Sequence, residues 1–170
     1  EVSEKTDIVV TYGQDMIEMD LKMDASYQYE DVQANFWDPT AQAIENTAGK
    51  APTANKQGDI DSKKLSSVLK HKELVQTTAP VTKDAIQSWA DSVYQRGHLS
   101  RIRGKIKCVG SEKLEVGKTV EIAAVGGRFN GDAYINKIRH SLKNAQWFTE
   151  VGIGLAQKSH LETYPSATPL

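Results

Sequence analysis

The sequence predicts a mainly β protein of the α+β class, in which short strands form a closed or nearly closed barrel and one helix packs against it. Two observations carry this prediction. Much of the 170-residue chain alternates apolar and polar side chains with a period of two, which is typical of half-buried strands. The segment 83–96 instead carries an apolar stripe at helical spacing. The length suits one ordinary domain.

Four strands are expected in the N-terminal third, at 8–12, 17–24, 32–37 and 40–46. The clearest is 17–24, where apolar residues alternate strictly with charged ones. A polar turn separates it from 8–12, so these two runs predict a hairpin. Asp38-Pro39 is expected to end the third strand, because proline cannot donate a hydrogen bond to a neighbouring strand.

The segment 48–80 is predicted to be a loop or an insertion within the domain. Its first part is rich in glycine, proline and polar residues. The part from Leu65 to Thr78 contains short apolar runs that fit either a helix or a strand.

One helix is expected over 82–97. Thr82 is suited to cap its first turn, and Asp84 places a negative charge near the positive end of the helix dipole. Gly97 is expected to end the helix in a left-handed conformation.

Four further strands are expected after the helix, at 99–109, 118–125, 133–142 and 147–155. Gly126-Gly127 and Asn130-Gly131 predict a tight connection between the second and third of them. The predicted domain covers 1–156. The remaining residues, 157–170, contain two prolines and are expected to form a linker or an extended tail.

Four basic side chains are expected on one face of the strand 99–109, namely Arg101, Arg103, Lys105 and Lys107. Like charges in a row repel, so something should offset them. Solvent, an acidic strand such as 17–24, a neighbouring subunit and a polar channel wall all remain open. Nucleic acid is disfavoured because no aromatic residues interleave with the basic ones. His140 is a further candidate, either as a base or ligand or as a residue bonded to backbone or a neighbouring subunit.

The remaining patterns exclude several functions. The net charge of −1 gives no bulk attraction to nucleic acid or to an anionic membrane, and no apolar run approaches the ~20 residues that span a bilayer. The four histidines lack the spacing of a zinc site, and Gly126-Gly127 is read as a turn and not as a phosphate loop. Cys108 alternates with Ile106 and should be buried. No catalytic residue, metal or cofactor is therefore predicted.

The second half of the chain resembles the hub region of VgrG (Rhs element Vgr) proteins and of the related phage tail hub proteins called late control protein D. The segments that carry the resemblance are 104–106, 116–122, 128–140 and 147–151. Phe36-Trp37-Asp38-Pro39 matches an earlier signal of that family, and the expected helix falls where the family has one.

This resemblance implies a phage tail-tube-like β-barrel with a packed helix and an inserted loop region. Family members are non-catalytic baseplate components that link the tube and the spike of a contractile injection system, of the type VI secretion or phage-tail kind. They assemble as homotrimers in the bacterial cytoplasm, with the tube protein on one side and the spike or an effector on the other. They are then secreted or injected, or remain in a virion tail. The family's flanking domains are absent from the sequence, so we expect a fragment of a longer protein.

Two alternatives remain. A carbohydrate-binding or adhesin-type β-domain would need exposed aromatic residues in a groove, for which Trp37, Trp89 and Trp147 are the candidates; the last two are expected in the core. A hydrolase would need Cys108, His140 and an acid to converge in a pocket, and burial of Cys108 would count against it.

Overall fold

The computed structural model describes residues 5–53, 56–77 and 79–156, which form nine strands and two helices. The strands are β1 (Lys5–Thr11), β2 (Met16–Met23), β3 (Tyr29–Asp38), β4 (Ala43–Ala48), β5 (His71–Gln76), β6 (Ile102–Val109), β7 (Thr119–Ala123), β8 (Gly131–Lys143) and β9 (Gln146–Ile153). The helices are α1 (Ser62–Leu69) and α2 (Lys83–Leu99). The mainly β class is confirmed, and the expectation of a single helix is wrong.

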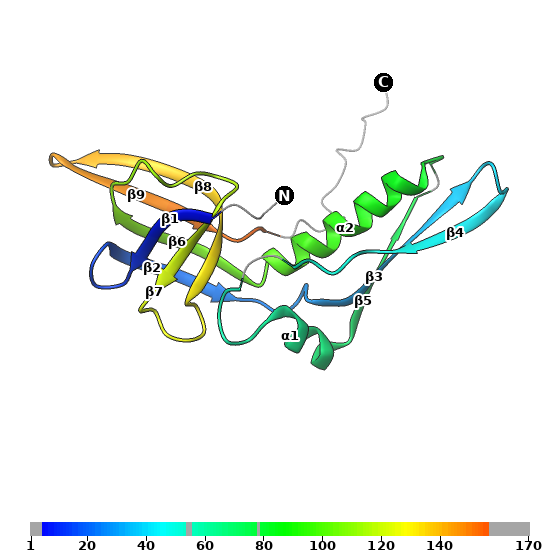
Figure 1. Cartoon of the computed structure of the whole chain (residues 1–170), viewed down its shortest axis with the longest axis horizontal. Coiled ribbons are helices and arrows are strands. Elements are labelled where there is room, and N and C mark those ends of the chain that lie inside the picture. Colours follow the sequence, from blue (N-terminus) through cyan, green and yellow to red (C-terminus); the bar gives the residue numbers. More distant parts are fainter. Residues whose placement is uncertain (1–4, 54–55, 78, 157–170) are drawn as a thin grey trace, which may run out of the picture.

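The larger sheet has six strands in the order β1-β7-β8-β9-β6-β2 and curls into a half-barrel (Figure 1). Its inner face is lined by buried aliphatic side chains, including Val10, Ile106, Ile122, Ile135 and Val151. These alternate along their strands with exposed or half-buried residues, as a half-buried sheet requires.

The expected hairpin between the first two strands is wrong, and the expected closed or nearly closed barrel is present only as a curled half-barrel. β1 pairs in parallel with β7, and the Tyr12 N–H donates to the Ala123 carbonyl oxygen at 3.0 Å. The turn after β1 therefore carries the chain from one edge of the sheet to the other. β1 and β2 are the two edges, and a single bridge between Tyr12 and Met16 connects them.

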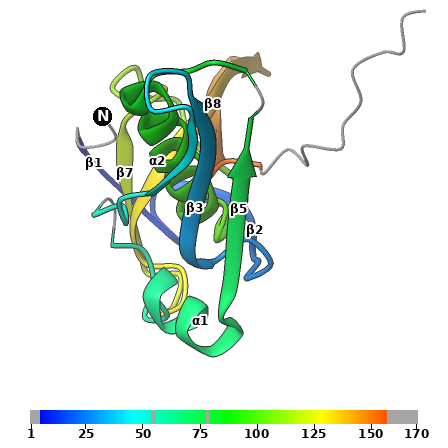
Figure 2. The same cartoon turned by 90° about the vertical axis from the view of Figure 1, so that its right-hand side faces the viewer.

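A second, three-stranded sheet has the order β4-β3-β5, with α2 across one face (Figure 2). β3 buries Val32, Ala34 and Phe36 on that face, where they pack with Ile86 and Ala90 of α2. The molecule therefore has two apolar cores, one inside the curled sheet and one between α2 and the small sheet.

The start of α2 is confirmed, because the Thr82 side chain accepts a hydrogen bond from the Ala85 N–H. The predicted end is wrong, since the helix continues through Gly97 to Leu99. A Cβ atom at position 97 would lie 2.6 Å from the Tyr27 carbonyl oxygen and 2.9 Å from the Tyr29 ring. This glycine therefore permits close packing of helix and strand and does not terminate the helix.

The segment 48–80 is not one continuous loop, because it contains α1 and β5. Asp61 caps α1 by accepting from the Lys64 N–H at 2.7 Å, and Lys70 ends it with a φ of 50°. The buried residues of α1 are two serines, whereas Val68 is 80% exposed. The helix does carry a short apolar stripe, formed by Leu65, Val68 and Leu69, but Val68 and Leu69 are exposed and the buried side of the helix is polar. The predicted tail at 157–170 lies outside the described residues.

Candidate functional site

Three of the four predicted basic side chains do share one face of β6. Lys107 lies opposite Glu18 of β2, and Lys105 lies opposite Asp20. The Lys107 ammonium is 3.3 Å from the Glu18 carboxylate. Of the explanations left open by the sequence, an acidic neighbouring strand is therefore the one that the structure shows. Because these side chains are partly exposed, such pairs contribute little to stability.

Asp24 continues this charged face beyond the end of β2. Its carboxylate accepts a hydrogen bond from the Ser26 N–H at 2.9 Å and another from Arg103. Hydrogen bonds from Ser26, supported by the charge of Arg103, hold the pKa of Asp24 below its ordinary value. Lys105 makes no ion pair among the described residues and keeps its charge available at the surface.

Arg101 does not belong to this face, which corrects the sequence prediction. Its side chain is only 3% exposed, because β6 begins one residue later and Arg101 lies in the turn after α2. The guanidinium donates to the Gln57 carbonyl oxygen at 2.6 Å and to that of Ile60. Burial lowers the pKa of Arg101, and the nearby charge of Asp61 opposes this effect. Arg101 thus holds the segment before α1 against the curled sheet.

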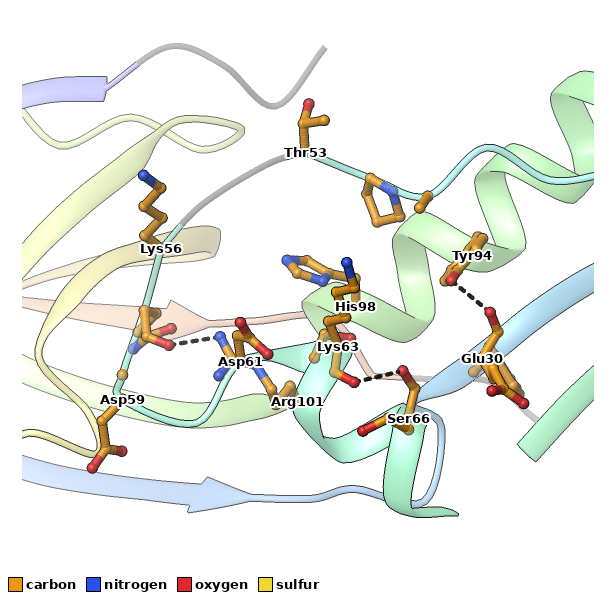
Figure 3. Close-up of a pocket in the computed structure, with 17 residues that line it drawn as sticks. Glu30, Thr53, Lys56, Asp59, Asp61, Lys63, Ser66, Tyr94, His98 and Arg101 are labelled. Atoms are coloured by element: carbon orange, nitrogen blue, oxygen red, sulfur yellow. Dashed lines mark hydrogen bonds between the residues drawn. The ribbon is translucent and has the colours of Figure 1, made fainter. Parts of the chain in front are cut away.

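A cavity of about 610 Å³ opens beside Arg101, between α1, the end of α2 and the segment before α1 (Figure 3). Its charged lining residues are Lys56, Lys63, Arg101, Glu30, Asp59 and Asp61. The Tyr94 hydroxyl on its wall donates to the Glu30 carbonyl oxygen at 3.1 Å, and burial raises the pKa of this phenol. The acids and bases are equal in number, so the lining favours neither cations nor anions.

His140 lies on the hairpin of β8 and β9, opposite Thr149. Its Nδ1 atom is 3.0 Å from the Thr149 hydroxyl, and its ring centroid is 5.6 Å from that of Trp147. Near its turn, the hairpin extends beyond the part of β9 that pairs with β6 and the part of β8 that pairs with β7, as Figure 1 shows. Trp147 is consequently 43% exposed, and its expected place in the core is wrong. Trp89 of α2 is also exposed, at 36%, so its expected place in the core is wrong as well.

Cys108 is buried, as the alternation predicts, with only 2% of its surface exposed. Its thiol donates to the Thr149 carbonyl oxygen at 3.4 Å. Burial raises the pKa of this thiol to about 11, so the nucleophilic thiolate is scarce at neutral pH. This contradicts the hydrolase alternative, which requires an accessible thiolate beside His140.

Two further findings concern the described part of the chain. It contains no group of three or more histidine, cysteine, aspartate or glutamate residues arranged to hold a metal ion. Neither of its helices is long and apolar enough to cross a membrane.

The sequence matches one family model over residues 1–144, and that family is described as the Alg8 N-terminal domain. No curated protein sequence matches the chain. Solved structures with a similar fold include two phage tail proteins. A tail protein from Neisseria meningitidis MC58 has a TM-score of 0.59 and 14% identity, covering 91% of this chain and 45% of its own. A 43 kDa tail protein of prophage MuSo2 from Shewanella oneidensis has a TM-score of 0.54 and 9% identity, covering 89% of this chain and 42% of its own.

The chain therefore spans less than half the length of either tail protein. The phage-tail type of fold implied by the sequence resemblance is confirmed, with a half-barrel and two helices in place of the expected closed or nearly closed barrel and single helix. The sequence did not predict the burial of Arg101 or the exposure of Trp147. Both residues lie at the end of an alternating segment, where the alternation no longer determines which side chains are buried.

Proposed function

The chain belongs to the Alg8 N-terminal domain family, and from the fold that it shares with two phage tail proteins we propose that it is a structural, non-catalytic part of a phage-tail-like assembly. The observation that carries this proposal is the shared fold over about nine tenths of the chain. The buried thiol of Cys108 and the balanced charges of the cavity support a structural role over a catalytic one.

Within such an assembly, we place the chain in the hub that joins the tube to the spike. The order of its sequence motifs supports this position. Its partners would be further copies of itself in a trimer, the tube protein on one side and the spike or an effector on the other. It would assemble in the bacterial cytoplasm and then be secreted or injected, or remain in a virion tail.

The surfaces proposed for subunit contacts are the charged face of β6 and the tip of the β8–β9 hairpin. Lys105 offers an unpaired charge on the former, among the described residues, and Asp20 lies opposite it. On the hairpin, His140 and Trp147 are exposed beside each other. Arg101 is excluded from this proposal because it is buried.

The test reverses the charged face in the intact protein, in the cells that build the assembly. Arg103, Lys105 and Lys107 are changed together to glutamate, and the matched control changes Lys50, Lys70 and Lys113, which are exposed elsewhere. We expect the first variant to reduce the yield of assembled particles and the control to leave it unchanged.

A third variant separates loss of assembly from loss of folding. It adds Glu18→Lys, Asp20→Lys and Asp24→Lys to the reversed face, so that each new glutamate again lies beside a cation. If the face contacts another subunit, this variant folds normally, as circular dichroism shows, and still fails to assemble. Normal assembly of both reversed variants would remove the face from the interface.

A further inference from the structure

The outer face of the three-stranded sheet carries no charge over three successive rows. In this sheet, directly paired residues share a face, and α2 covers the opposite one (Figure 2). The outward rows are Ala48, Gln33 and Leu74, then Asn46, Asn35 and Gln76, then Ile44 and Trp37. In a chain with 25% charged residues, such a charge-free stretch of surface is a candidate contact surface.

Trp37 and Ile44 form an apolar platform at one end of this face. They are cross-strand neighbours, and they are 44% and 74% exposed. Together with Asn35, Gln76 and the neighbouring Phe36 and Thr77, they line a groove of about 800 Å³. An exposed indole beside an aliphatic side chain provides a flat surface that gains free energy when another apolar face covers it.

Three side-chain amides surround the platform without partners. Asn35, Asn46 and Gln76 make no side-chain hydrogen bond within the described parts of the chain. Each amide supplies two N–H donors and one carbonyl acceptor. Gln33 differs, because its amide donates to the Asp31 carboxylate at 2.9 Å. The groove therefore presents donors and acceptors side by side, next to an aromatic ring.

We propose that this groove binds a neutral saccharide, with the sugar ring stacked on Trp37. A pyranose has an apolar face of C–H groups, which suits an indole, and a rim of hydroxyls that both donate and accept. Asn35 and Gln76 match that rim, because an amide also does both. The absence of charge in the three rows favours a neutral sugar over a uronic or sulfated one, since no cation is there to offset an anion.

This site goes beyond the proposed assembly role and stands on different residues. The test measures tryptophan fluorescence in the Trp89→Phe, Trp147→Phe variant, in which Trp37 is the one remaining tryptophan of three. Maltoheptaose and dextran are the neutral probes, and polygalacturonate is the acidic one. We expect a saturable change in Trp37 emission with the neutral probes, at millimolar affinity.

Saccharide binding by the matched variants is measured by NMR titration, which does not depend on a tryptophan. Trp37→Ala should weaken binding about tenfold or more, and Asn35→Ala or Gln76→Ala several-fold, whereas Trp147→Ala should bind like the wild type. Three results would overturn the proposal. These are no saturable response to either neutral probe, equal or tighter binding of polygalacturonate, or light scattering that shows a dimer which Trp37→Ala dissociates.

Discussion

The indole of Trp147 lies directly on the backbone of Gly110. A Cβ atom at position 110 would lie 2.2 Å from the Cδ2 atom of the ring, well inside van der Waals contact. The Gly110 N–H also donates to the Trp147 carbonyl oxygen at 2.9 Å, so the strand and the ring are held together at one point. Trp147 therefore keeps its place on the exposed hairpin because residue 110 has no side chain.

Gly110→Ala should displace this ring and destabilise the fold by about 1–3 kcal/mol, the usual cost of forcing extra atoms into a packed contact. Urea denaturation followed by tryptophan fluorescence measures the effect. Gly127→Ala is the control, because its new Cβ would meet nothing closer than the Asp59 carboxylate at 3.7 Å. Equal stability of the two variants would show that Trp147 does not pack on Gly110.

The turn between β8 and β9 holds two non-glycine residues at positive φ, Asn144 at 52° and Ala145 at 58°. This is the backbone of a tight hairpin turn that favours Asn-Gly. Ala145→Gly should stabilise the protein by about 1 kcal/mol, because glycine adopts this conformation without a Cβ clash. Thermal unfolding should show a higher Tm. Ala43→Gly, in β4 at ordinary φ, should lower it, and a lower Tm for Ala145→Gly would contradict the turn geometry.

The thiol of Cys108 should resist modification in the folded protein. With a pKa raised from 9.0 to about 11, its folded form stays protonated, and the stability linked to this group is lost only as the pH rises from 9.0 toward that value. A disulfide reagent at pH 8 should react slowly until urea is added. An exposed thiol, introduced as Lys113→Cys in a Cys108→Ala background, should react at once. Rapid modification of native Cys108 would reopen the hydrolase alternative.

Acid should remove the contribution of Asp24 to the stability of the folded protein. Its pKa in the folded protein lies below the ordinary 3.8, so its stabilising contribution is present above about pH 4 and is lost as the pH falls through the lowered value. Asp24→Asn should therefore be less stable than the wild type at neutral pH, and the difference should shrink toward pH 2. Asp20→Asn, which removes a carboxylate without an ion pair among the described residues, should show a smaller difference at neutral pH.

The sequence predicted those helices and strands whose pattern lies within their own residues. The alternation in β2 and β6 placed acidic and basic side chains on matching faces, and Thr82 marked the start of α2. Both features depend on neighbours a few residues apart, or on a strict period of two. They could be predicted because no distant partner changes them.

Other elements depend on partners far away in the sequence. β1 finds its partner in β7, more than a hundred residues later, so no local rule could exclude the hairpin with β2. α1 buries Ser62, whose hydroxyl donates to the Gln28 amide oxygen, so its packing contact is polar and depends on a residue 34 positions away. The groove beside Trp37 requires β5 to lie next to β3, and the ambiguous segment 65–78 concealed that pairing.

The central claim is that the chain is a structural part of a tail-like assembly, and it is tested most directly by what purified particles contain. Quantitative mass spectrometry of intact particles from the cells that encode the protein should find its peptides at a constant ratio to the tube protein. Cross-linking should join Lys105 to a second copy or to the tube protein. Particles that are complete without this chain, with the protein free in the soluble fraction, would contradict the claim.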